Sequence, residues 1–203
     1  MPNHPDNELD ELRTQADAGQ VEAQFQLALR LDNAEGTGRD IAKAAGWYQR
    51  AAEQGHPDAQ LHIGLLLNTG DGIERNDAEA ARWFLLAAKQ GLADAQFNIG
   101  LMYYTAEGME QNFAEALHWF RNAAEQGNGK AQFNLGVMYA NGEGLEQNNI
   151  EVYKWWMLAV MQGDRNAESN MQLIRDRLSA DERTAAEGMV ADWINAFQNQ
   201  ALH

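Results

Sequence analysis

Ala93–Gly127 reads ADAQFNIGLMYYTAEGMEQNFAEALHWFRNAAEQG, and similar stretches recur on both sides of it at a step of 36 residues. Glycine marks the step at positions 19, 55, 91, 127 and 163, alanine at 23, 59, 95, 131 and 167, and tryptophan at 47, 83, 119 and 155. A period of this size indicates stacked repeats, each of which buries its apolar face against its neighbours. The sequence therefore predicts a repeat array.

Each repeat contains two helical patterns, which we call helix A and helix B. In helix A of the third repeat, Ala95, Ile99, Met102 and Tyr103 recur at the spacing of one helical face. Gly100 and its equivalents lie in the middle of this helix, where glycine costs about 1 kcal/mol relative to alanine. This recurring cost predicts a close approach of a second helix, with no room for a Cβ atom. Helix A then ends in a loop with a glycine expected at positive φ: Gly36, Gly72, Gly108 and Gly144.

Helix B has clear start and stop signals. Favoured N-cap residues stand where it is expected to begin: Asp40, Asn76, Asn112 and Asn148. The helix is expected to end at Gln126-Gly127 in the third repeat, with glycine just after the last turn. The recurring tryptophans occur at helical spacing with alanines beside them, so we expect them in the core: Trp47, Trp83, Trp119 and Trp155.

The repeat positions predict one continuous array after a short polar tail. Residues 1–7 are expected to be a disordered tail, and residues 8–199 a single solenoid. Its parts are an N-terminal capping helix (8–18), four repeats (20–55, 56–91, 92–127 and 128–163), and a partial repeat with a C-terminal cap (164–199). Ser179 and Glu182 form a predicted capping box for the last helix. That helix carries an apolar face: Met189, Val190, Trp193 and Phe197.

Composition limits the classes of partner. Hydrophobic residues make up 45% of the chain and charged residues 22%, as in ordinary globular proteins. The chain has 15 Lys and Arg against 30 Asp and Glu, which gives a net charge of −15. Such a surface repels phosphate backbones and anionic lipids, so we expect no nucleic acid and no membrane as partners, and instead a neutral or basic protein segment. The start MPNHPDNELD lacks a signal peptide, which predicts a cytoplasmic protein unless a leader is missing from the sequence.

The residues that carry most catalytic chemistry are scarce. There is no cysteine, and serine occurs only at positions 169 and 179, outside the known nucleophile motifs. Glu115-x-x-His118 has the spacing of a di-iron helix, but the equivalents of His118 are not histidines. No phosphate-binding G-x-x-x-x-G-K-[ST] occurs. We therefore expect no enzyme activity, no cofactor and no metal.

The pattern A-x-x-x-(L/I)-G-x-x-(Y/L), followed by the loop glycine, the N-cap and (E/K)-A-x-x-W-(F/Y)-x-x-A-A-x-Q-G, resembles the Sel-one-like repeat family. This family is a 36-residue relative of the tetratricopeptide repeat, and the resemblance covers residues 19 to 175. It implies an all-α, right-handed α-solenoid of helix-turn-helix repeats with capping helices at both ends. It also implies a non-catalytic adaptor in protein–protein interaction, as in many bacterial members, but the family shares no common ligand.

In tetratricopeptide-like arrays the A helices line a concave groove, and the resemblance therefore implies which residues bind a peptide or partner segment. Two rows are apolar or aromatic: Phe25, Leu61, Phe97 and Phe133, then Leu29, Leu65, Leu101 and Val137. One row is polar: Gln26, His62, Asn98, Asn134 and Asn170. Asn68 and Tyr104 lie near the edge. Carboxamides offer a donor and an acceptor, which suits the amide groups of an extended peptide.

Other interpretations remain open at this point. The phenylalanines could instead pack between neighbouring A helices, and the Asn/Gln row could be solvated surface. In another functional class, the protein would bind small molecules or cell-wall fragments, or act as a weak hydrolase, as the resemblance to some family members suggests. Self-assembly through the ends of the array is a third hypothesis, and the sequence leaves the oligomeric state open.

Overall fold

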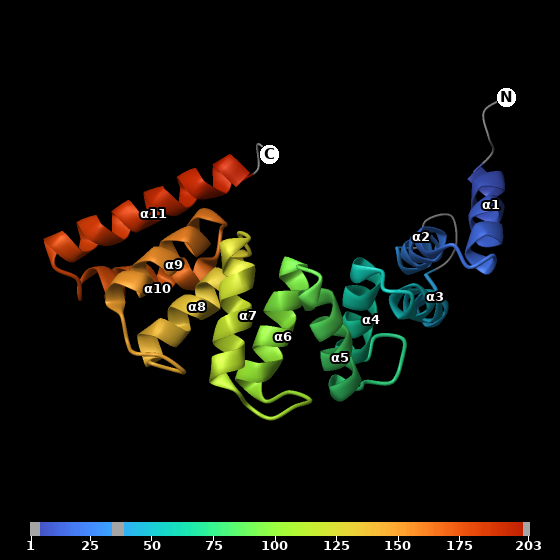
Figure 1. Ribbon diagram of the computed structural model, residues 1–203, viewed down its shortest axis with the longest axis horizontal. Coiled ribbons are helices and arrows are strands. Elements are labelled where there is room, and N and C mark those ends of the chain that lie inside the picture. Colours follow the sequence, from blue (N-terminus) through green and yellow to red (C-terminus); the bar gives the residue numbers. More distant parts are fainter. Residues whose placement is uncertain (1–4, 34–38, 201–203) are drawn as a thin grey trace. The chain divides into compact units, whose positions relative to one another are not determined.

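The structure is a computed structural model that describes residues 5–33 and 39–200, and all regular secondary structure in these ranges is helical (Figure 1). The chain forms two compact units. The first contains the residues up to Ala95 together with 107–110, and the second contains Gln96–Ala106 and the chain from Gln111 onward. The all-α fold class predicted from the repeats is confirmed.

The first unit contains five helices within its described residues: α1 (Pro5–Asp17), α2 (Val21–Asp32), α3 (Ile41–Glu53), α4 (Pro57–Thr69) and α5 (Asp77–Lys89). Each packs against the next, so that α2 and α4 are A helices and α3 and α5 are B helices. The first helix begins at Pro5, three residues before the predicted start, so residues 5–7 of the expected tail are helical. Residues 1–4 and the predicted loop glycine Gly36 lie outside the described ranges.

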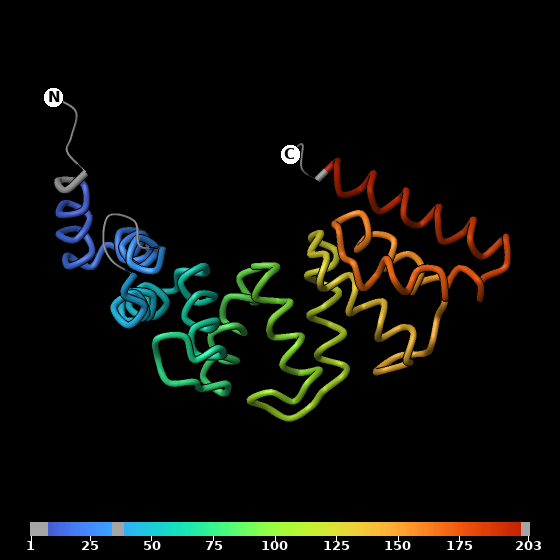
Figure 2. The backbone as a smooth tube through the Cα atoms, turned by 180° about the vertical axis from the view of Figure 1, so that it is seen from behind, coloured from blue at the N-terminus to red at the C-terminus, as the bar shows by residue number. Residues whose placement is uncertain are grey.

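The second unit holds α6 (Ala93–Thr105) from Gln96 onward, α7 (Phe113–Glu125), α8 (Gly129–Asn141), α9 (Asn149–Met161), α10 (Arg165–Arg175) and α11 (Ala180–Gln200). Viewed from behind, its backbone shows the same alternation of A and B helices as the first unit (Figure 2). Among the described helices, none is both long and apolar enough to cross a membrane.

Side-chain caps fix the start of every B helix at the predicted residue. The oxygens of Asp40, Asn76, Asn112 and Asn148 each accept a hydrogen bond from a backbone N–H in the first turn. At the start of α11, the Ser179 N–H donates to Glu182 Oε2 over 2.9 Å and the Glu182 N–H donates to Ser179 Oγ over 3.3 Å. These reciprocal bonds confirm the predicted capping box.

The mid-helix glycines permit the close approach that the sequence predicted. A Cβ atom on Gly64 would lie 2.7 Å from the Phe84 ring, and one on Gly100 would lie 2.8 Å from the Phe120 ring. Both rings belong to the B helix of the same repeat and are almost fully buried. In these two repeats, the aromatic residue that follows the tryptophan therefore fills the space between the two helices.

The tryptophan prediction is only half right. Trp119 and Trp155 are buried, with 8% and 3% of their surface exposed. Trp47 and Trp83 are only half-buried. For Trp155, the helix α11 packs on α9 and belongs to the cluster that buries the indole. The Arg50 guanidinium partly covers Trp47, 4.4 Å from the centre of its ring.

Candidate partner-binding face

We use the term A-helix face for the fifteen positions predicted above to bind a partner segment. Seven of them lie on α2 and α4 in the first unit, and eight lie on α6, α8 and α10 in the second unit. The two sets have different surroundings.

In the first unit, the aromatic and apolar row is buried. Phe25 and Leu61 have only 8% and 9% of their surface exposed. The Phe25 ring stacks on His56 with 4.3 Å between ring centres and lies 6.0 Å from the Tyr48 ring. For these two positions the packing interpretation is therefore the better description, since little of either side chain is available to a ligand.

His62 is part of the same aromatic cluster. Its ring lies parallel to the Tyr48 ring with 4.8 Å between the centres. Burial lowers the pKa of His62, and the nearby carboxylates Asp32 and Asp58 oppose this effect. The lowered pKa favours the neutral imidazole near pH 7, with one donor and one acceptor nitrogen.

The remaining positions of the first unit are partly engaged. Gln26 is exposed, and its amide donates to Glu22 over 2.8 Å. Asn68 Nδ2 donates to Asp77 Oδ1 over 3.1 Å. Leu29 and Leu65 are half-buried, so each keeps some apolar surface accessible.

In the second unit, the apolar rows are accessible. Phe97, Leu101, Phe133 and Val137 are all half-buried. The Lys130 ammonium lies 5.9 Å from the centre of the Phe97 ring. The Phe133 ring lies parallel to Trp156 at 6.2 Å, and the Trp156 indole N–H donates to the Phe133 carbonyl over 3.1 Å. These contacts fix the positions of the rings while part of their surface stays open.

Polar groups accompany these rings. Asn98, Asn134 and Asn170 are half-buried, and Asn134 Nδ2 donates to the Lys130 carbonyl over 2.8 Å. The Tyr104 hydroxyl donates to Glu143 over 2.8 Å. Burial and this carboxylate raise the pKa of Tyr104 to about 12, so its hydroxyl stays protonated near neutral pH. The second unit therefore combines accessible apolar side chains with amide and hydroxyl groups.

A row of buried glutamines was missed by the sequence analysis. Gln24, Gln60, Gln96 and Gln132 are buried next to the A-helix face. Gln60 Nε2 donates to the Ala52 carbonyl over 3.1 Å, and Gln60 Oε1 accepts from Gln90 Nε2 over 2.8 Å. The signal was present in the sequence, as an Ala-Gln pair at the start of every helix A and a Gln-Gly pair at the end of every helix B. These glutamines tie helices together and are not offered to a ligand.

His118, which the sequence analysis considered for its di-iron spacing, has an amide neighbour in the structure. His118 is exposed, with Nε2 3.2 Å from the Asn122 amide nitrogen. Within residues 5–33 and 39–200, no three His, Asp or Glu side chains gather closely enough to hold a metal ion.

Comparisons with known proteins place this architecture in a family. The chain is similar to the crystal structure of a protective antigen of uropathogenic Escherichia coli strains with an SLR fold, at 30% identity and a TM-score of 0.87. The match covers 98% of this chain but only 43% of that protein. A Sel1 repeat protein from Oxalobacter formigenes matches with 28% identity and a TM-score of 0.74, over 86% of this chain and 71% of that one. No curated protein matches the chain.

The sequence profile of the Sel1 repeat matches four consecutive segments, 21–56, 57–92, 93–128 and 129–164. Each matched segment contains one A helix and the B helix that follows it. Since these four segments cover well over half of the chain, and since the helix pairs of the structure follow the same period, the protein belongs to the Sel1 repeat family.

Proposed function

We propose that this protein is a non-catalytic interaction module that binds a segment of another protein on its A-helix face. Sel1 repeat proteins are generally scaffolds for protein interaction, and the family is generally non-catalytic. The proposal for this chain goes further, because it assigns the binding surface. The observation that carries it is the set of half-buried apolar side chains on α6 and α8, with asparagines between them.

The second unit supports the proposal better than the first. Phe97 and Phe133 keep apolar surface accessible, while their equivalents Phe25 and Leu61 in the first unit are buried. Leu101 and Val137 are half-buried, as are their first-unit equivalents. An extended segment would place its apolar side chains against these apolar residues of α6 and α8. Its backbone would form hydrogen bonds with Asn98 and Asn134. The net charge of −15 favours a segment that is neutral or basic.

The test is capture of partners from the native cell with the intact chain and with a double variant, Asn98→Ala with Asn134→Ala. The expected result is that proteins retained by the wild type, identified by mass spectrometry, are lost with the double variant. The matched control is Asn122→Ala, a half-buried asparagine on the B helix α7, which should retain them. If a double variant with an intact circular dichroism spectrum and melting temperature captured the same proteins, the A-helix face would be excluded as the binding surface.

The small-molecule alternative rests on family resemblance alone. It covers binding of cell-wall fragments and weak hydrolysis. A thermal-shift series with muropeptides distinguishes it from the proposal, since a ligand of the folded state raises the melting temperature with its concentration. The proposal expects no rise.

A further inference from the structure

Two B helices carry the same apolar pair, and only one of the pairs is covered. The segment after the repeat tryptophan reads Trp-Phe-Leu-Leu86 in α5 and Trp-Trp-Met-Leu158 in α9, so leucine stands three residues after the tryptophan in both. The equivalent residues in α3 and α7 are Arg50 and Asn122. Leu158 is buried, with 2% of its surface exposed, while 45% of Leu86 is exposed.

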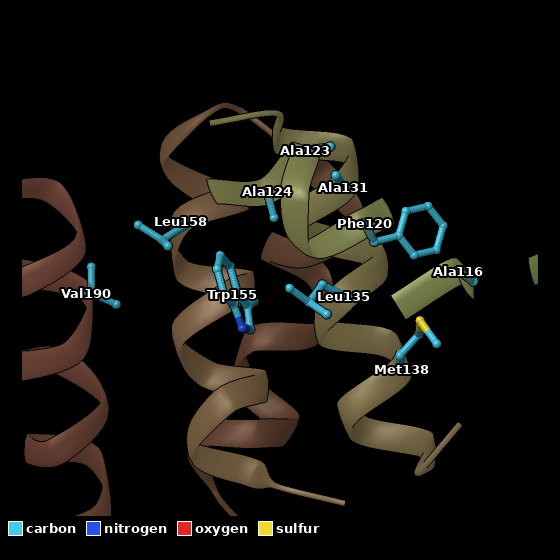
Figure 3. Close-up of a cluster of buried hydrophobic side chains, with 10 residues drawn as sticks. All are labelled: Ala116, Phe120, Ala123, Ala124, Ala131, Leu135, Met138, Trp155, Leu158 and Val190. Atoms are coloured by element: carbon cyan, nitrogen blue, oxygen red, sulfur yellow. The ribbon is translucent and has the colours of Figure 1, made fainter. Parts of the chain in front are cut away.

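The cover over Leu158 is the C-terminal helix α11. Trp155, Leu158 and Val190 belong to one buried cluster, with Trp193 and Ile194 packed against it. In the close-up, Leu158 points away from the bundle toward the helix that bears Val190 (Figure 3). Further along α11, the Phe197 ring lies against the backbone of Gly127, where an added Cβ would approach it to 2.9 Å. The helix α11 therefore does more than cap the last repeat: it extends across α9 to the end of α7.

The first unit holds an open copy of this contact. Subtracting two repeats, or 72 residues, from Gly127, Trp155 and Leu158 gives Gly55, Trp83 and Leu86. Trp83 is half-buried, Leu86 is exposed, and a Cβ on Gly55 would meet nothing within 4 Å. The three residues that contact α11 in the second unit thus have equivalents in the first unit. Within the described residues, no helix covers these equivalents.

The open copy lies along a groove between α3 and α5. One cavity of about 290 Å³ is lined by Gln49, Glu53, Glu79, Arg82, Trp83 and Leu86. A second cavity of about 510 Å³ shares Gln49 and Glu79 with the first and extends over Gly46. The second unit has His118 and Arg121 in the places of Gly46 and Gln49, so shorter and uncharged side chains keep this groove open and leave it less basic.

We propose that this groove, which Trp83 and Leu86 line, binds an amphipathic helix of a partner protein that packs as α11 packs on α9. The apolar stripe of that helix follows the one on α11, where Val190, Trp193, Ile194 and Phe197 are spaced at i, i+3, i+4 and i+7. Its flanks are basic, because the three carboxylates of the groove (Glu53, Glu74 and Glu79) outnumber its two cations, Arg82 and Arg75, and Arg75 is already paired with Asp77 and Glu107. The surface is separate from the A-helix face of the proposed function.

The probe is a fluorescein-labelled peptide with the sequence of residues 180–200 that carries Glu187→Lys and Asp192→Lys. In the second unit Glu187 accepts a hydrogen bond from Tyr153, whose equivalent in the first unit is Ala81, so the lysine loses no partner in the groove. Fluorescence anisotropy measures its binding to the full chain. The matched control peptide also carries Trp193→Ala and Phe197→Ala, and should bind at least about tenfold more weakly.

The decisive protein variant is Leu86→Asn, which installs the residue that α7 has at the same place. It should weaken probe binding by about tenfold or more, because it replaces the exposed apolar side chain of Leu86 in the groove with a polar one. Leu173→Asn is the matched control. Leu173 is 62% exposed on α10, which belongs to the second unit, whereas the groove belongs to the first. This control should bind the probe as the wild type does.

Three results would overturn the proposal. The first is the absence of probe binding to the wild-type chain, or equal binding to Leu86→Asn. The second is loss of binding in Leu158→Asn but not in Leu86→Asn, since the probe would then be exchanging with α11. The third is self-association of the wild type in sedimentation that Leu86→Asn abolishes, because the occupant would then be a second copy of this chain.

Discussion

At the scale of single residues, Gly100 and Gly188 show how surroundings decide the effect of the same substitution. Both lie inside helices of the second unit, where alanine is intrinsically favoured over glycine by about 1 kcal/mol. A Cβ on Gly100 would lie 2.8 Å from the fully buried Phe120 ring, whereas one on Gly188 would meet no atom of the described part of the chain within 4 Å. At Gly100, helix propensity therefore favours alanine while packing disfavours it. At Gly188, only the helix propensity, which favours alanine, has an effect.

We expect Gly100→Ala to lower the free energy of unfolding by about 1–3 kcal/mol, since a buried ring has no free space to move into. Gly188→Ala should raise it by up to about 1 kcal/mol. Urea unfolding followed by circular dichroism measures both changes. If Gly100→Ala were as stable as the wild type, the α6–α7 contact would be looser than the structure shows.

His62 should make the stability of the first unit dependent on pH. Burial lowers the pKa of the folded imidazole below its ordinary value of 6.5, so the unfolded chain binds a proton more readily. The contribution of neutral His62 is fully present above pH 6.5 and is lost as the pH falls through the folded pKa. We expect the free energy of unfolding to decrease as the pH falls below about 6.5.

The matched variant is His62→Asn, because asparagine stands at the equivalent positions of α6 and α8. It also loses the stacking on Tyr48, so its stability is expected to be lower at every pH. The informative quantity is the slope: urea unfolding at several pH values should show a weaker dependence in the variant. An identical slope in both proteins would exclude His62 as the titrating group.

At the scale of elements, the buried glutamines act as repeated ties between neighbouring helices. In the first unit, Gln60 joins the carbonyl at the end of α3 to Gln90 at the end of α5. In the second unit, Gln132 Nε2 donates to the Ala124 carbonyl over 3.1 Å, but Gln132 Oε1 is buried without a hydrogen-bond partner among the residues that the structure describes. A buried acceptor without a partner costs about 1–3 kcal/mol.

We therefore expect Gln60→Leu to destabilise the protein more than Gln132→Leu. The first substitution removes two hydrogen bonds, which contribute roughly 1 kcal/mol each: the bond from Gln60 to the Ala52 carbonyl and the bond from Gln90 to Gln60. The second removes one hydrogen bond and also eliminates an unsatisfied oxygen. Urea unfolding of both variants measures the difference, and a larger loss for Gln132→Leu would mean that its oxygen does have a partner.

At the scale of the whole molecule, the two proposals assign different surfaces to different partners. The A-helix face offers accessible apolar and amide groups on α6 and α8, whereas the groove on α3 and α5 lies on B helices. Both surfaces belong to a chain with a net charge of −15, which favours neutral or basic segments. Because the Asn98/Asn134 variant and the Leu86 variant change different units, failure of one experiment leaves the other informative.

The sequence by itself determined the repeat, the helix pairs and the start of each B helix. Asn112 caps α7 and Gly127 ends it through contacts within a few residues, so the pattern was sufficient to place both. The glycine at position 100 similarly predicted a close approach of the next helix, and the Phe120 ring makes this contact. These features are local, or repeat at the same step, and they need no knowledge of distant parts of the chain.

Only the tertiary structure decided which surfaces are covered. Leu86 and Leu158 occupy the same place in their repeats, yet the first is exposed and the second is buried. The same holds for Phe25, buried against His56, and for Phe97, which keeps surface accessible. Burial depends on elements that are remote in sequence, such as α11 over α9, and a 36-residue pattern carries no information about where such an element lies.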